Sequence, residues 1–148
     1  MPYQKIVYSG KKSNSDLITK GFPKPNIMLG NFNVVEDGID RLPCKHNNTI
    51  VMESLWEVRS HLSLIDGWRT NSHTYKGYTH TQKPAISKVR LDRIYLTQRI
   101  VDTATDWEID KSGIKTDHSL VSVIITNPEA PFIHKGRWKL PLFLLEDK

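Results

Sequence analysis

The amino-acid sequence predicts a layered α/β fold in a single domain. Short β-branched runs alternate with one clearly amphipathic helical segment, which is typical of a sheet covered by a helix. The sequence contains no glycine-rich phosphate loop, so a nucleotide cradle is not expected. The length of 148 residues suits one domain with its own hydrophobic core.

The first part of the chain carries weak structural signals. Residues 1–15 hold Gly, Ser, Asn and Lys around one short apolar stretch, which predicts an irregular lead-in. Residues 16–20 can form one helical turn, which Gly21 and the two prolines that follow it would stop. The apolar run at residues 27–29 then predicts a buried strand.

The middle of the chain contains the clearest helical pattern. The segment after the candidate N-caps at residues 47–49 has apolar residues at spacings of four, three and four, namely Val51, Leu55, Val58 and Leu62. We interpret it as a helix that covers a sheet and has no catalytic role. Further strands are predicted at residues 78–81, 89–96 and 120–125, because these runs are rich in β-branched and aromatic residues.

Composition limits the function classes. Lys and Arg number 21 against 16 Asp and Glu, and the resulting net charge of +5 favours a polyanionic partner without requiring one. Cys44 is the only cysteine, so we expect no internal disulfide and an intracellular location, cytoplasmic or nuclear. No apolar run approaches the roughly 18–20 residues that span a bilayer, so no membrane partner is expected.

Polar residues gather where the predicted strands and the helix end. These residues are Asn31, Asn33, Asp66, Trp68, Arg69, Asp92, Asp117 and His118. Loops at strand ends often carry function. Each residue alone also has a structural explanation, as a turn former, a strand cap or, for Asp92, an ion-pair partner of Arg90 or Arg93. The remaining histidines have no such neighbours and are interpreted as structural: His46, His61, His73, His80 and His134.

The order of these blocks is more specific than any one of them. In sequence they read Gly-Asn-Phe-Asn from residue 30, then "DGWR", "YT", "RLDRIY" and "TDH". This series resembles the C-terminal half of the endonuclease/exonuclease/phosphatase superfamily, whose pattern is Gly-Asp-Phe-Asn, later Arg-Ile-Asp-Tyr or Arg-Ile-Asp-Arg, and last Ser-Asp-His. The segments "GFPKPNIMLGNFNVVEDGIDRLP", "DGWR" and "KGRWKLP" are most similar to the endonuclease region of fungal non-LTR retrotransposons.

The resemblance implies part of a deoxyribonuclease-I-like, four-layered α/β/β/α sandwich from which the N-terminal half is missing. Residues 16–128 would be the C-terminal portion of that domain, and residues 129–148 a tail. The absent half normally supplies further active-site residues and covers part of a sheet. A partner chain, or the absent half itself, is therefore expected to cover the sheet surface left open here.

The resemblance also implies roles for individual residues. Asn31, Asn33, Asp92 and His118 match catalytic positions, and Asp117 matches a ligand of Mg²⁺ or Mn²⁺. The expected reaction is divalent-metal-dependent hydrolysis of DNA phosphodiesters. The residues expected to line the cleft or contact the phosphate backbone are Trp68, Arg69, Tyr78, Thr79 and Arg90, since Arg suits phosphate and aromatic faces suit bases.

One residue departs from the pattern. Asn31 stands where the superfamily has Asp, and an amide is neither charged nor basic at neutral pH. Strand alternation would turn Asn31 and Asn33 toward one site and Phe32 toward the core. With few acidic ligands, metal binding should be weak.

Three hypotheses about function follow from that departure and from the missing N-terminal half, which points to impairment as well. One is an impaired endonuclease, and another is a non-catalytic nucleic-acid-binding remnant held to the phosphate backbone by Arg69, Arg90, Arg93 and Lys115. The third is a degenerate fragment, or a scaffold that a partner completes.

Overall fold

The computed structural model describes residues 24–45, 49–82, 87–111 and 113–126. The predicted lead-in at residues 1–15, the helical turn at 16–20 and the tail at 129–148 lie outside this part of the chain. The predicted boundaries between these regions therefore stay predictions.

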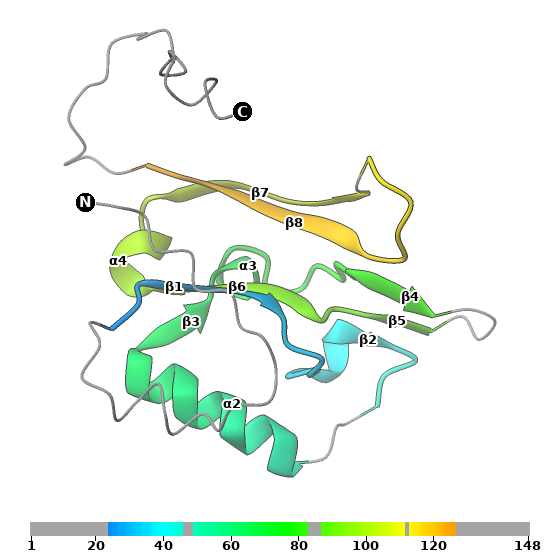
Figure 1. Ribbon diagram of the computed structural model, residues 1–148, viewed down its shortest axis with the longest axis horizontal. Helices are drawn as coiled ribbons and strands as arrows, with labels where there is room; N and C mark the ends of the chain where they lie inside the picture. Colours follow the sequence, from blue (N-terminus) through cyan, green and yellow to red (C-terminus); the bar gives the residue numbers. More distant parts are fainter. Residues whose placement is uncertain (1–23, 46–48, 83–86, 112, 127–148) are drawn as a thin grey trace, which may run out of the picture.

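Short strands and helices follow one another along the described chain (Figure 1). In order they are β1 (Ile27–Asn31), the 3-10 helix η1 (Gly38–Asp40), β2 (Arg41–Leu42), α2 (Thr49–Leu62), β3 (Leu64–Asp66), α3 (Gly67–Asn71), β4 (His80–Gln82), β5 (Ser87–Val89), β6 (Asp92–Thr97), α4 (Gln98–Val101), β7 (Ala104–Lys111) and β8 (Ser119–Ile125). They form three antiparallel sheets with the strand orders β1-β6-β3, β2-β5-β4 and β7-β8.

Strand β6 is the centre of the fold. Its neighbours are β1 on one side and β3 on the other, and its residues Tyr95 and Leu96 are fully buried. Directly paired residues of an antiparallel sheet project from the same face, and Asn31 of β1 pairs with Asp92 at the start of β6. The register of this sheet therefore places two of the predicted catalytic residues side by side.

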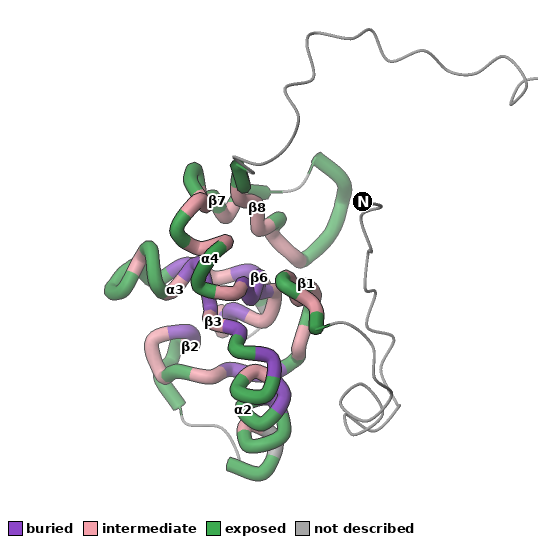
Figure 2. The backbone as a smooth tube through the Cα atoms, turned by 90° about the vertical axis from the view of Figure 1, so that its left-hand side faces the viewer, coloured by how far each residue is buried: buried purple, intermediate pink, exposed green. Residues whose placement is uncertain are grey.

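One face of this sheet is covered by α2, as the helical spacing predicts. Leu55, Val58 and Leu62 are buried and form the core with Tyr95 and Leu64. Figure 2 shows the buried positions gathered where α2, β3 and β6 meet. The helix begins at Thr49, so the predicted caps at positions 47 and 48 fall outside the described residues, as does the side chain of Val51.

The other face of the sheet is covered by the β7–β8 hairpin (Figure 1). The predicted strand at residues 120–125 is confirmed as β8, and its partner β7 carries Trp107 toward the central sheet, where its ring lies against Gly67. Helix α2, the central sheet and the hairpin thus form three successive layers. Such a stacking agrees with part of an α/β/β/α sandwich.

Three predicted strands differ from the structure. The run at 27–29 is not a buried strand, because β1 is the edge of its described sheet and Leu29 is 52% exposed. The run at 89–96 is two strands, since β5 ends at Val89 and β6 begins at Asp92 in a different sheet. The strand predicted to start at Tyr78 starts at His80.

Gly67 is required by the close packing of two layers. A Cβ atom there would overlap the ring of Trp107 and lie 3.2 Å from Leu96 Cδ1. We expect Gly67→Ala to lower the free energy of unfolding by about 1–3 kcal/mol, measured by urea denaturation, because overpacking forces side chains out of their rotamers. Gly113→Ala is the matched control, since a Cβ at Gly113 would meet nothing within 4 Å. Equal stability of the two variants would contradict this account.

Helix α2 is the longest helix of the described residues, with 14 residues. Neither it nor any other helix in that part of the chain combines the length and apolar character needed to cross a membrane.

Candidate active site

A short polar contact at the end of the central sheet joins Asp92 to His118. Asp92 Oδ2 lies 2.8 Å from His118 Nδ1, and both side chains are half-buried. Asp92 begins β6 and His118 immediately precedes β8, so two layers of the fold meet here. A carboxylate on Nδ1 fixes the imidazole tautomer and orientation and leaves Nε2 available for chemistry. The structure thus joins two residues that the sequence series placed 26 positions apart.

The side chain of Thr79 is hydrogen-bonded to the backbone at Asp92. Its hydroxyl oxygen accepts hydrogen bonds from the backbone N–H groups of Leu91 and Asp92, each at 3.0 Å, and the residue is only 1% exposed. Its carbonyl oxygen accepts a hydrogen bond from the backbone N–H of Ser119 at 2.6 Å. Thr79 therefore connects the Asp92 turn to the start of β8. Its buried hydroxyl is bonded within the protein, and the predicted contact of Thr79 with substrate stays a prediction.

Asn31 lies beside this pair. It is paired with Asp92 in the β1–β6 register, and its side-chain Oδ1 accepts a hydrogen bond of 2.9 Å from the backbone N–H of Asn33. Asn33 has a φ of +54°, a left-handed conformation that asparagine tolerates. Strand alternation ends at Asn31, so it does not by itself turn Asn33 to the same face. Phe32 is partly buried against the core, as predicted, with its ring 4.9 Å from that of Tyr95.

Asp117 contacts His80, a histidine that was predicted to be structural. His80 Nε2 lies 3.2 Å from Asp117 Oδ2, and the rings of His80 and His118 are 4.6 Å apart. A hydrogen bond from its own backbone N–H and the bond to His80 lower the pKa of the Asp117 carboxyl. The structural interpretation of His80 was therefore incomplete. Its place two residues after Tyr78, in a strand predicted to reach the cleft, was the available signal.

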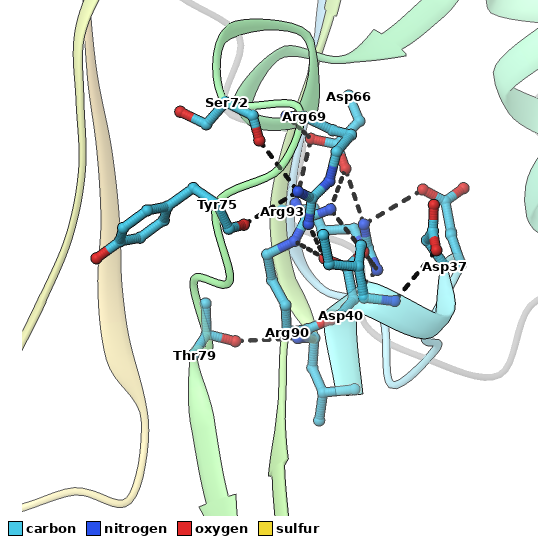
Figure 3. A network of polar contacts seen from close by, with 12 residues as sticks. Asp37, Asp40, Asp66, Arg69, Ser72, Tyr75, Thr79, Arg90 and Arg93 are labelled. Carbon is cyan, nitrogen blue, oxygen red and sulfur yellow. Dashed lines mark hydrogen bonds and ion pairs between the residues drawn. The ribbon is translucent and has the colours of Figure 1, made fainter. Parts of the chain in front are cut away.

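Two of the predicted phosphate-binding arginines lie in a buried ionic network (Figure 3). Arg90 is 1% exposed and donates hydrogen bonds of 2.6–3.2 Å to both Asp40 and Asp66. Arg69 pairs with Asp40 and also donates to the carbonyl oxygens of Ser72, His73 and Tyr75. These guanidinium groups are occupied by the protein itself. The contacts observed for Arg90 and Arg69 thus lie within the protein, and their predicted contact with phosphate stays a prediction.

The same network lowers the pKa values of its two buried aspartates, Asp40 and Asp66. Arg93, which is also buried, donates to Asp66 Oδ2 at 2.8 Å and to Asp40 Oδ2 at 3.1 Å. Burial alone would raise the pKa values of Asp40 and Asp66, but the hydrogen bonds and positive charges of the arginines outweigh it and lower both. Asp92 is absent from this network, so the explanation of Asp92 as an ion-pair partner of Arg90 or Arg93 is wrong.

The two predicted aromatic contacts differ in accessibility. Trp68 is 5% exposed and packs against Gly77 and, edge to face, against Tyr75. It is a core residue beneath the β7–β8 layer. Tyr78 is half-buried and lies directly before Thr79, so it is the predicted aromatic residue that is partly accessible.

The oxygen ligands near this site suit Mg²⁺ poorly. Asp117 is 69% exposed, but Asp92 is bonded to His118, and Asn31 Oδ1 is bonded to the Asn33 backbone. Mg²⁺ requires near-octahedral oxygen coordination that usually includes one or two carboxylates. Within the described residues, Asp117 is the one predicted metal ligand whose carboxylate is largely open to solvent.

Comparison with known proteins identifies the fold. No family model matches the sequence, and no curated protein sequence matches it. Solved structures do match, and they share the deoxyribonuclease-I-like fold that the motifs imply. The chain has this fold.

Three of the matching solved structures are those of a phosphatase, an AP endonuclease and an endonuclease domain. They are the 3′ phosphatase NExo from Neisseria bound to a product DNA hairpin (19% identity, TM-score 0.59), the AP endonuclease LMAP from Leishmania major (18%, 0.57) and the endonuclease domain of TRAS1, a telomere-specific non-LTR retrotransposon (16%, 0.58). The matches cover 68%, 69% and 82% of this chain but 44%, 35% and 56% of those chains. This chain therefore spans about half or less of their length.

Proposed function

We propose that this chain is part of a divalent-metal-dependent nuclease domain that hydrolyses DNA phosphodiesters, with a catalytic site weakened by Asn31. The observation that carries the proposal is the 2.8 Å contact between Asp92 and His118 at the end of the central strand of a deoxyribonuclease-I-like sheet. A reducing intracellular compartment, cytoplasmic or nuclear, fits its single cysteine.

The pair can do specific work on a phosphodiester. With Nδ1 held by Asp92, protonated His118 can donate the proton on Nε2 to a phosphate oxygen or to the leaving oxygen as negative charge grows. The Asp92 carboxylate fixes the ring orientation that this donation needs. Weak Mg²⁺ or Mn²⁺ binding by Asp117, as the resemblance implies, belongs to the same proposal.

The weakness of the site follows from Asn31. Its amide lies on the residue paired with Asp92, where the superfamily pattern has an acid. An amide cannot accept a proton from water at neutral pH, so the attacking water has no general base at this position. General-base assistance is worth about 10²–10⁴-fold in rate.

A second candidate function is metal-independent binding of nucleic acid without hydrolysis. It is favoured by Asn31 and by the net charge of +5. Arg90 and Arg93 are buried and Arg69 pairs with Asp40, so of the four basic residues expected to contact phosphates Lys115 is the exposed one. Binding of this kind would weaken steeply with rising salt and survive a chelator.

The test is nicking of supercoiled plasmid by the purified chain with Mg²⁺ or Mn²⁺. We expect slow nicking that a chelator abolishes and that His118→Ala reduces about 10²-fold or more, since an acid-base group is lost. His73→Ala, a change at an exposed histidine outside the site, should leave the rate unchanged. Nicking that persists in His118→Ala would refute the proposed role of the Asp92–His118 pair.

The second candidate makes a different prediction for the same samples. If the wild-type chain does not nick but shifts DNA in a gel, and the shift persists in chelator and disappears at higher salt, the binding function is the correct one. Filter binding across a salt series measures this directly.

A further inference from the structure

Two histidines and one aspartate meet at the junction of β4 and β8. We propose that His80, Asp117 and His118 form a binding site for Zn²⁺ or a similar transition-metal ion. The proposal rests on the geometry of these three side chains and does not depend on nuclease activity. The potential ligand atoms of the three residues all lie within 4.8 Å of one another.

The spacing is close to what a tetrahedral ion requires. Zn²⁺ binds imidazole nitrogen and carboxylate oxygen at about 2.0–2.2 Å, so neighbouring ligand atoms around it are roughly 3.3 Å apart. His80 Nε2 and Asp117 Oδ2 are already 3.2 Å apart. The widest separation in the group, up to 4.8 Å, closes to that value by movements of about 1.5 Å, which side-chain rotation provides.

The backbone that carries these ligands is tied together. His80 and His118 form an antiparallel β-bridge. On either side of this bridge, the Ser119 N–H donates to the Thr79 carbonyl oxygen at 2.6 Å and the Thr81 N–H donates to the Asp117 carbonyl oxygen at 3.4 Å. Ligands on paired strands are positioned more rigidly than ligands on loops, so less ordering is needed when an ion binds.

His118 is also oriented as a metal-binding histidine usually is. Its Nδ1 is held by the Asp92 carboxylate at 2.8 Å, which leaves Nε2 as the ligand atom. A carboxylate on the second ring nitrogen is the common support of histidines that bind zinc, because it fixes the tautomer and raises ligand basicity. Asp117 is 69% exposed, so an ion and a water in the fourth position can reach the site from solvent.

The ligand set selects the ion. Imidazole nitrogens suit Zn²⁺ and its neighbours in the transition series, whereas Mg²⁺ prefers oxygen ligands. The site therefore differs in chemistry from the magnesium site that the sequence motifs imply. Occupation would engage Nε2 of His118, and if the proposed function holds, the bound ion would block the proton donation assigned to that atom.

The experiment is isothermal titration of the purified chain with ZnCl₂ in a buffer that contains excess Mg²⁺. We expect one Zn²⁺ site that Mg²⁺ does not compete for, weakened more than about tenfold in His80→Ala and about 10–100-fold in Asp92→Asn, which removes the support of His118. His61→Ala and His73→Ala are the matched controls, because both histidines are exposed and lie outside the group, and both should bind as the wild type does.

Two further measurements keep the proposal falsifiable if His80→Ala fails to fold. Asp117→Ala changes an exposed side chain and should also weaken Zn²⁺ binding more than about tenfold. In the wild-type chain, Zn²⁺ should shift the imidazole NMR signals of His80 and His118 but not those of His61. Unchanged affinity in Asp117→Ala, or unmoved His80 and His118 signals, would overturn the site. None of these readouts involves DNA, so a failure of the proposed nuclease function would not alter them.

Discussion

Asn31→Asp should raise metal-dependent plasmid nicking by about 10²–10⁴-fold, the usual gain from a general base. The new carboxylate would lie beside Asp92, with which residue 31 is paired, and therefore next to the Asp92–His118 contact. There it can accept a proton from the attacking water and add a charged oxygen ligand for Mg²⁺. The measurement is the initial rate of nicking at several Mg²⁺ concentrations.

The substitution should fold as the wild type does. Asn31 uses its Oδ1 to accept the hydrogen bond from the Asn33 N–H, and an aspartate oxygen can accept the same bond. Placing a second carboxylate opposite Asp92 costs about 0.2–1 kcal/mol by the usual range for cross-strand pairs. A modest decrease in thermal stability is therefore expected in the absence of metal.

The control is Asn71→Asp, which makes the same chemical change at an exposed position at the end of α3, away from Asp92. It should not increase nicking. If folded Asn31→Asp is no faster than Asn71→Asp, the missing acid at residue 31 is not what limits the site, and the shortage of oxygen ligands for Mg²⁺ becomes the better explanation.

Arg90→Met should lower the free energy of unfolding by about 3–5 kcal/mol, the usual cost of removing one partner from a buried ion pair. Arg90 is 1% exposed and is the one residue of the network that donates two side-chain hydrogen bonds to each of Asp40 and Asp66. Methionine fills similar space but leaves both buried carboxylates with fewer donors. Urea denaturation measures the loss, and the thermal transition should fall with it.

Arg41→Met is the matched control, because Arg41 lies on β2 beside this network and no side-chain ion pair is observed for it within the described part of the chain. It should change stability by less than about 1 kcal/mol, as surface substitutions generally do. A loss below about 1 kcal/mol in Arg90→Met would mean that Arg93 and Arg69 can neutralise Asp40 and Asp66 without it.

The sequence was most informative where its signals are local. The spacing of Leu55, Val58 and Leu62 predicted the buried face of α2, since helical periodicity depends only on residues within a few turns. The β-branched run from residue 120 predicted β8, because strand propensity also depends on neighbouring residues in the sequence. The strand at 27–29 was found, but its burial was not, because burial depends on which strand lies beside it and what covers it.

In the candidate site, too, local motifs were predicted from the sequence, whereas contacts between distant segments were not. The ordered motifs pointed to Asp92, Asp117 and His118, and the structure brings Asp92 and His118 together. The motifs gave only an indirect signal for the companion of Asp117, the place of His80 two residues after Tyr78, because His80 lies 37 residues away and meets Asp117 through the pairing of two strands. The ion pairs of Arg69 and Arg90 were not predicted, since an arginine in a sequence gives no sign of the acids that will neutralise it, and their contact with phosphate stays a prediction.

By itself, then, the sequence determined the α/β class, the helix and the order of the polar motifs, because patterning and motif order are properties of the chain. The tertiary structure decided which charged side chains are paired inside the protein and which face solvent. Contacts between residues 24–53 positions apart join Asp92 to His118 and bury Arg90 and Arg93 on Asp40 and Asp66. Such contacts depend on strand register and layer packing, and a change of one residue in the register of β6 would turn Asp92 and Arg93 to the opposite faces.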